Sequence, residues 1–169
     1  MEIKLRPWEL SDLTSLVKYA NNPKIAGNMT DAFPSPYTEE SGRAFISMAQ
    51  KGVSAYLMAI EVEGEAVGGI GIHRQSDIMR KNAELGYWLA EPFWGQGIIT
   101  AAIKDMVAYG FSHFEFTRIF ARPFGNNVAS QKVLQKAGFT LEATFEKTLI
   151  KNGELQDELI YAIRKTHAQ

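Results

Sequence analysis

A glycine-containing turn between a predicted strand and a predicted helix has the residue types that bind phosphate. Trp94 to Thr100 (WGQGIIT) follows the strand-like residues 83–90 and opens a helix-like segment over residues 98–114. The first N–H groups of a helix have no partner within it and lie at the positive end of its dipole. Glycine lets a ligand approach the backbone because it has no Cβ. The same residues also suit a plain tight turn, so both interpretations stay open.

A carboxylate lies on the predicted strand that leads to this turn. Side chains alternate along a strand, so Glu84 shares a face with Trp88 and Ala90. A carboxylate in such a place is a candidate general base, able to accept a proton from a reacting group. The structural alternative is that Glu84 lies near the sheet edge, in an ion pair with Arg80 or Lys81.

A second predicted helix start carries an amide and a hydroxyl in its first turn. Asn127 is a favourable N-cap for a helix that reaches Ala137, and Ser130 follows three residues later. If both helix starts face one cleft, an anionic ligand could lie between them and contact Asn127 and Ser130. Simple capping explains the same residues, so this alternative also stays open.

Composition narrows the classes of partner and chemistry. The 169 residues have a net charge of −1 and are 46% hydrophobic, which predicts a single domain over residues 1–169 with no nucleic-acid or membrane partner. The absence of cysteine excludes disulfides, cysteine nucleophiles and thiolate metal sites, and three scattered histidines predict no metal centre. No signal peptide or transmembrane-length apolar run is present, so a cytoplasmic location is expected.

The remaining periodicity predicts a mixed sheet with helices packed on it. The predicted strands cover residues 2–8, 55–62, 66–73, 83–90, 118–122, 139–150 and 154–164. The predicted helices cover residues 11–21, 38–51, 98–114 and 127–137. Ser11 is the expected N-cap of the first helix, and Ala44, Phe45 and Met48 are expected to face the core from the second.

Two blocks of sequence resemble the GNAT-fold acetyltransferases, in the branch that includes the ribosomal-protein N-terminal acetyltransferases. The blocks are AELGYWLAEPFWGQGIIT at residues 83–100 and NVASQKVLQKAGF at residues 127–139, with KNGELQDELIYA at 151–162 in the closing hairpin. The order of elements agrees with that family across nearly all of the chain. The resemblance implies an α/β (α+β mixed) fold, with a central, mostly antiparallel sheet of about seven strands and about four helices packed on it.

The resemblance also implies acetyl-CoA as the donor and coenzyme A as a product. Trp88 and Leu89 would then offer backbone groups to the pantetheine arm, which Asn127 would also contact. Ser130 aligns with the hydroxyl proposed in this branch to protonate the departing thiolate, and Glu84 with the glutamate proposed to take the amine's proton, directly or through water. The pyrophosphate would lie on the backbone N–H groups of Gly95, Gln96, Gly97, Ile98, Ile99 and Thr100.

The chain departs from the family pattern at two positions. Pro92 stands where the family's phosphate loop usually begins with glutamine or arginine, so side-chain help to the phosphate is lost while the backbone cradle remains. Leu134 stands where many members place a tyrosine acid on the second helix. Ser130 or bulk water is then the proton source.

These features support three hypotheses about function. The first is an acetyl-CoA-dependent N-acetyltransferase acting on a primary amine such as the N-terminal amine of a ribosomal protein. The second keeps the chemistry but changes the acceptor to a small molecule: a polyamine, an aminosugar or an antibiotic. The third is a non-catalytic acyl-CoA-binding module, which a Glu84 buried in an ion pair would favour. Residues 23–37 and 74–81, of mixed charge, would select the acceptor, and a homo-oligomer through the final hairpin remains open.

Overall fold

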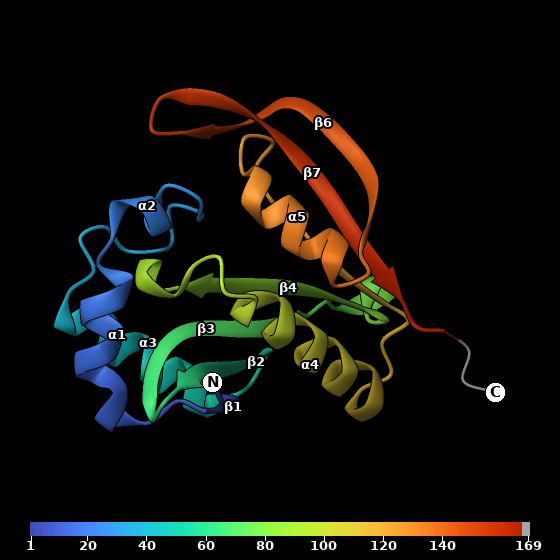
Figure 1. The fold of residues 1–169 in the computed structure, drawn as a ribbon. Coiled ribbons are helices and arrows are strands. Elements are labelled where there is room, and N and C mark those ends of the chain that lie inside the picture. Colours follow the sequence, from blue (N-terminus) through green and yellow to red (C-terminus); the bar gives the residue numbers. More distant parts are fainter. Residues whose placement is uncertain (167–169) are drawn as a thin grey trace.

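The computed structural model describes residues 1–166 and contains one seven-stranded sheet (Figure 1). The strand order is β1-β2-β3-β4-β5-β7-β6, and every neighbouring pair is antiparallel except β4 and β5, which are parallel. The strands are β1 Ile3–Pro7, β2 Ala55–Val62, β3 Glu65–Arg74, β4 Asn82–Leu89, β5 Arg118–Ala121, β6 Thr140–Lys151 and β7 Glu154–Arg164. The predicted mixed, mostly antiparallel sheet is confirmed.

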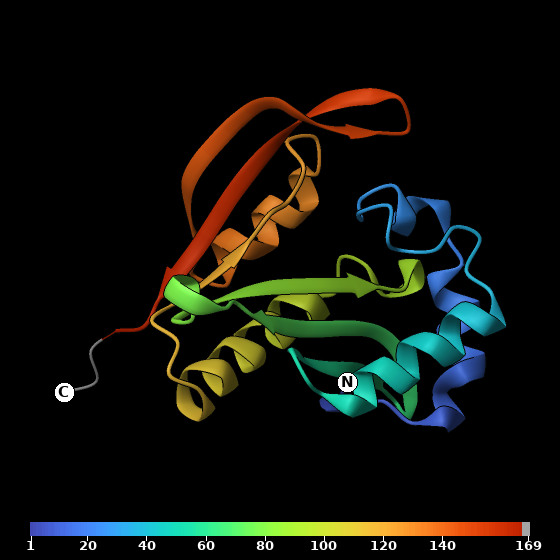
Figure 2. The same cartoon turned by 180° about the vertical axis from the view of Figure 1, so that it is seen from behind.

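Helices cover both faces of this sheet. They are α1 Leu13–Ala20, α2 Pro23–Ala26, α3 Glu39–Lys51, α4 Ile98–His113 and α5 Val128–Lys136. Figure 1 shows α4 on the near face, and Figure 2, seen from behind, shows α1 and α3 on the other. Two hydrophobic clusters correspond to these faces: Ile103, Met106 and Leu134 belong to the α4–α5 cluster, whereas Leu16, Ile46 and Trp88 belong to the α1–α3 cluster. Among the helices of residues 1–166, none combines the length and apolarity needed to cross a bilayer.

Two predicted details of the N-terminal helices are wrong. Ser11 lies within a short 3-10 turn, Leu10–Asp12, and α1 begins after Asp12. In α3 the buried residues are Gly42 and Ile46, whereas Ala44 and Met48 are exposed. The close approach of α1 decides which face is buried, because a Cβ on Gly42 would lie 2.7 Å from Leu13 Cδ1.

A partly buried charge cluster fastens the start of α1 to the sheet. The Arg6 guanidinium of β1 donates to both carboxylate oxygens of Asp12, at 2.8 and 2.7 Å, and to the Glu61 carboxylate of β2. Burial opposes ionisation of Asp12, but hydrogen bonds from Arg6 and from the Glu9 N–H outweigh it and hold the pKa of Asp12 below its ordinary value. The folded state therefore favours the ionised carboxylate.

Replacing Asp12 by alanine is expected to lower the free energy of unfolding by about 3 kcal/mol at neutral pH, because it breaks a desolvated ion pair. Since the folded-state pKa of Asp12 is lowered, its contribution is complete above the unfolded pKa and disappears as pH falls through the folded pKa. Urea unfolding of both proteins at about pH 7 and about pH 3 measures this. A stability difference that stays the same at the two pH values would contradict the assignment.

The feature that positions the site is the early separation of β4 from β5. The two strands pair only over Asn82–Glu84 and Arg118–Phe120. β4 then continues to Leu89 with no strand partner on that side in the described part of the chain, while β3 pairs with its other edge throughout. We call residues 85–89, on the side that faces away from β3, the open edge of β4. An open strand edge can bind an extended ligand through its peptide groups.

Candidate functional site

The glycine turn ends in a helix start whose N–H groups are free. Gly97 is the N-cap of α4 in the left-handed conformation, with φ of 77°, and no side chain caps the helix. The first helical bond runs from the Ala101 N–H to the Gly97 carbonyl, at 3.1 Å, so the N–H groups of residues 98–100 have no acceptor within the helix. Among residues 1–166, no atom outside the neighbouring residues lies within 4 Å of a Cβ built on Gly95 or Gly97. The turn therefore presents free donors on an open side, which fits a pyrophosphate group.

Two side-chain bonds hold this turn against the end of β4. Trp94 Nε1 donates to the Leu89 carbonyl at 2.7 Å, and Gln96 Nε2 donates to the Pro92 carbonyl at 3.1 Å. The side chain of Gln96 therefore folds back onto its own turn. Any contribution of Gln96 to phosphate binding comes from its backbone, as predicted for the whole turn.

The start of α5 confirms the predicted cap. Asn127 Oδ1 accepts a hydrogen bond from the Ser130 N–H at 3.2 Å. Both α4 and α5 begin on the side of the molecule toward which β4 runs (Figures 1 and 2). The contact of Asn127 with a cofactor remains a prediction, and the cap leaves its Nδ2 group available for it.

Peptide groups on the open edge of β4 belong to Tyr87 and Leu89. Successive residues of a strand direct their peptide groups to alternate sides, and the Ala90 N–H donates to the Val67 carbonyl of the β3 segment at 2.8 Å. Trp88, two residues before Ala90, therefore also faces β3. The expectation that Trp88 offers backbone groups to a ligand is corrected: its peptide groups lie in the β3 ladder, and its indole is buried. Because the Leu89 carbonyl already accepts from Trp94, the Leu89 N–H is the group left for a ligand.

A hydrogen bond joins the open edge to α5 on the face that α4 and α5 cover. The Tyr87 hydroxyl lies 2.5 Å from Ser130 Oγ. Burial raises the pKa of Tyr87 to about 12, although the hydrogen bond with Ser130 acts in the opposite direction. Sequence reasoning placed Ser130 in the site but missed Tyr87. The sequence feature that pointed to Tyr87 was its position three residues after Glu84 on the same strand. This position places the Tyr87 side chain on the opposite face of β4, where the helix that carries Ser130 lies.

Glu84 lies on the opposite face of β4, near the point where β4 and β5 separate. Its side chain is 29% exposed, and the nearest cation is Arg122, with Nη1 3.8 Å from Glu84 Oε1. Arg122 makes its closer ion pair with Glu158, at 2.6 Å. The expected partners of Glu84 were wrong, because the parallel pairing of Glu84 with Phe120 brings β5 and its neighbour Arg122 beside it. Glu84 is thus neither fully buried nor tightly paired.

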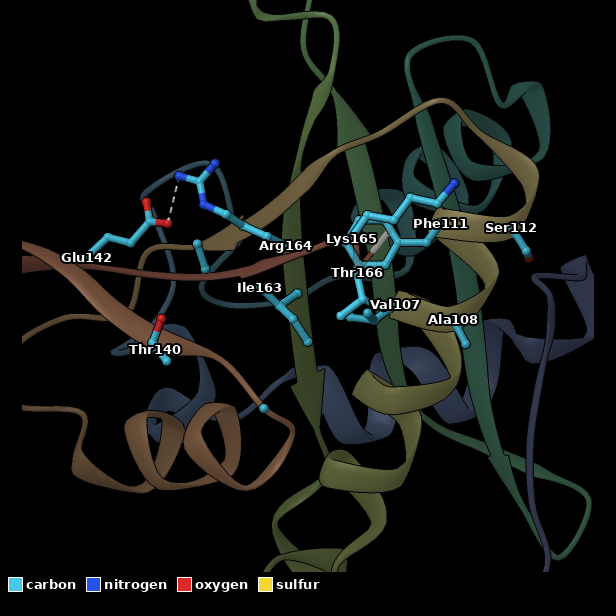
Figure 3. Close-up of a pocket in the computed structure, with 12 residues that line it drawn as sticks. Val107, Ala108, Phe111, Ser112, Thr140, Glu142, Ile163, Arg164, Lys165 and Thr166 are labelled. Carbon is cyan, nitrogen blue, oxygen red and sulfur yellow. Dashed lines mark hydrogen bonds and ion pairs between the residues drawn. The ribbon is translucent and has the colours of Figure 1, made fainter. Parts of the chain in front are cut away.

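Two cavities lie outside this arrangement. An open cavity of about 880 Å³ lies between the C-terminal half of α4 and the end of β7, and Figure 3 shows Phe111, Glu142 and Arg164 among its lining residues. None of the predicted site residues lines it. A polar cavity of about 230 Å³ lies beside the turn between β6 and β7, next to the ion pair of Lys151 with Asp31 at 3.0 Å. Within residues 1–166, no three His, Asp or Glu side chains are grouped as metal ligands.

Comparison with known proteins agrees with this geometry. The family model described as the acetyltransferase (GNAT) domain matches residues 2–140. The chain is 31% identical over 147 residues to the putative ribosomal N-acetyltransferase YdaF of Bacillus subtilis, covering 87% of this chain and 75% of that protein. It is 23% identical over 163 residues to the spermidine N(1)-acetyltransferase of Escherichia coli, covering 93% and 83%. The structure of the microcin C7 self-immunity acetyltransferase MccE, in complex with acetyl-CoA and AMP, matches with a TM-score of 0.82 at 28% identity, covering 97% and 93%.

Proposed function

The chain belongs to the GNAT acetyltransferase family and is an acetyl-CoA-dependent N-acetyltransferase, and we propose that its acceptor is the N-terminal amine of a protein, such as a ribosomal protein. The observation that carries the site assignment is that a carboxylate and a hydroxyl, the proposed base and acid, lie on opposite faces of one strand. Glu84 lies on one face of β4, and Ser130 contacts the other face through Tyr87. The open edge of β4 lies between them.

The residues present fit acetyl-CoA. We assign the pyrophosphate to the free N–H groups of residues 98–100, beside the open sides of Gly95 and Gly97. The peptide groups of Tyr87 and Leu89 would hold the pantetheine arm by adding it to the sheet as a strand-like ligand, with Asn127 beside it. Bound in this way, the thioester supplies the acetyl group.

The roles of the side chains follow from their positions. An amine that is protonated at neutral pH cannot attack a carbonyl, so Glu84 accepts its proton, directly or through a water. An N–H group on the open edge of β4 is placed to stabilise the oxyanion that develops on the attacked carbonyl. Ser130 donates a proton to the thiolate that leaves. Alignment of the reacting groups by the site contributes to the rate in addition to these proton transfers.

The charge around the acceptor loops favours a peptide over a polyamine. Lys24 pairs with Glu91 at 2.5 Å, and Asp31 pairs with Lys151 at 3.0 Å, so these loop charges are neutralised. The polar cavity next to Asp31 has mixed lining, with Lys151, Glu154 and amide side chains. A polyamine carries several positive charges and needs uncompensated carboxylates, whereas a peptide can use mixed polar contacts. The YdaF relative, named as a putative ribosomal N-acetyltransferase, points the same way.

An acetyl-CoA consumption assay over a panel of acceptors tests this proposal. We expect short peptides with free N-termini to stimulate thiol release, and the same peptides with blocked N-termini and an internal lysine to be inactive. Spermidine, aminosugars and aminoglycosides complete the panel. If one of these small amines is acetylated and none of the peptides is, the proposed protein acceptor is wrong and the acceptor is a small molecule. Cofactor binding with no turnover on any amine would favour the non-catalytic module.

A further inference from the structure

The Tyr87 and Ser130 hydroxyls form a hydrogen bond, and Tyr87 has no role so far in the proposed reaction. Ser130 is held at both ends: its N–H donates to Asn127 Oδ1, and its Oγ lies 2.5 Å from the Tyr87 hydroxyl. Within residues 1–166, the Tyr87 hydroxyl has no other hydrogen-bond partner. Its ring packs against the hydrophobic cluster under α4. The phenol is therefore fixed in place and aimed at a single oxygen.

The direction of this hydrogen bond decides what Ser130 can do. A hydroxyl has one hydrogen to donate and two lone pairs to accept with. If Ser130 donates to Tyr87, its only hydrogen is used and it cannot protonate anything else. If Tyr87 donates to Ser130, the hydrogen of Ser130 is free to point to another acceptor. Burial keeps the Tyr87 phenol protonated across the physiological range, with its pKa raised to about 12, so a donating phenol is always present.

We propose that Tyr87 is a positioning residue that donates to Ser130 Oγ and so directs the Ser130 proton to the departing thiolate. This inference rests on the proposed function, because it requires a leaving thiolate. As the carbon–sulfur bond breaks, its electron pair stays on sulfur, the O–H bond of Ser130 breaks and an S–H bond forms. The Ser130 oxygen takes the phenolic proton of Tyr87. The phenolate regains a proton from water once the product thiol leaves, and Glu84 releases the amine's proton to solvent.

The acidity of the two hydroxyls determines which of the two oxygens is left deprotonated. An alkyl hydroxyl such as that of Ser130 is about as weak an acid as water and a much weaker acid than a phenol. Even after burial, the Tyr87 phenol, with a pKa of about 12, is the stronger acid of the pair. Ser130 can therefore lose its proton to sulfur while drawing another from Tyr87, without forming a free alkoxide. A phenolate of such high pKa is also a strong base, so it regains its proton readily.

Tyr87→Phe removes the hydroxyl and keeps the ring. We expect kcat to fall by about tenfold or more, with the KM for acetyl-CoA nearly unchanged, because the lost interaction acts on the leaving group. Ser130→Ala should lower kcat at least as much, and the double variant should be no slower than Ser130→Ala alone, since Tyr87 acts only through Ser130. The matched control is Tyr161→Phe, which removes another buried hydroxyl, hydrogen-bonded to Gln135, and should retain wild-type kcat.

Equal kcat in Tyr87→Phe and wild type would overturn the proposal. A double variant whose loss of kcat equals the product of the two single-variant losses would also overturn it. If Tyr87→Phe does not fold, replacing Tyr87 by 3-fluorotyrosine keeps the ring and hydroxyl but makes the phenol more acidic. The alkaline decline of kcat should then move to lower pH, and an unchanged pH profile would overturn the proposal. If the wild type shows no turnover with any amine, the proposed function fails instead, so the two failures are distinguishable.

Discussion

Glu84→Gln is expected to lower kcat by about a hundredfold to ten-thousandfold while the affinity for acetyl-CoA stays the same. The glutamine side chain keeps the size of Glu84 but cannot accept the proton that the amine must lose. The free N–H groups of residues 98–100, which we assign to the pyrophosphate, lie after the end of β4 and do not involve this side chain. Steady-state kinetics with a peptide acceptor, together with calorimetric titration of acetyl-CoA, separates the two effects.

Glu115→Gln is the matched control for this variant. Glu115 is a solvent-exposed carboxylate that pairs with Lys81 at 3.2 Å, and its side chain is 94% exposed. We expect the kcat of Glu115→Gln to equal that of the wild type, because an exposed ion pair contributes little to the stability of the fold. Undiminished turnover in Glu84→Gln would remove Glu84 from the mechanism.

Gly97→Val is expected to weaken acetyl-CoA binding by about a hundredfold, equivalent to about 2.8 kcal/mol. Gly97 adopts φ of 77°, which a β-branched residue rarely tolerates, so the turn has to change shape. A valine side chain would also stand beside the N–H groups of residues 98–100. The dissociation constant from calorimetry measures the loss.

Gly64→Val separates backbone strain from loss of the binding site. Gly64 lies in the turn between β2 and β3 with φ of 85°, and a Cβ there also meets no protein atom within 4 Å. We expect the two variants to lose similar thermal stability, while only Gly97→Val loses affinity for acetyl-CoA. If both variants bind acetyl-CoA as the wild type does, the turn before α4 does not hold the pyrophosphate.

The elements that frame the site were predictable because their signals are local. The hydrophobic period of residues 98–114 predicts α4, which spans Ile98–His113. Asn127 predicts the start of α5 through its own side chain, and Asn152-Gly153 predicts the last turn, where both residues have positive φ. In each case, residues within a few positions of one another determine the conformation.

The errors concern contacts between segments far apart in the sequence. The buried face of α3 depends on how closely α1 approaches Gly42, which the pattern of α3 alone does not contain. Glu84 lies near Arg122 rather than Arg80 or Lys81 because β5 pairs in parallel with β4. The contact of Tyr87 with Ser130 likewise requires knowing where α5 packs against β4. Strand parity placed Glu84 and Tyr87 on opposite faces of β4 but could not identify the partners of either side chain.

The most direct test of the site is a titration of the protein with coenzyme A followed by backbone amide chemical shifts. The largest changes should occur at the amides of Gly95 to Thr100 and at Leu89 and Ser130, where the two helix starts and the open edge of β4 lie. Changes concentrated instead around the cavity lined by Phe111 and Arg164, or no changes at all, would contradict the assignment of the cofactor to this site.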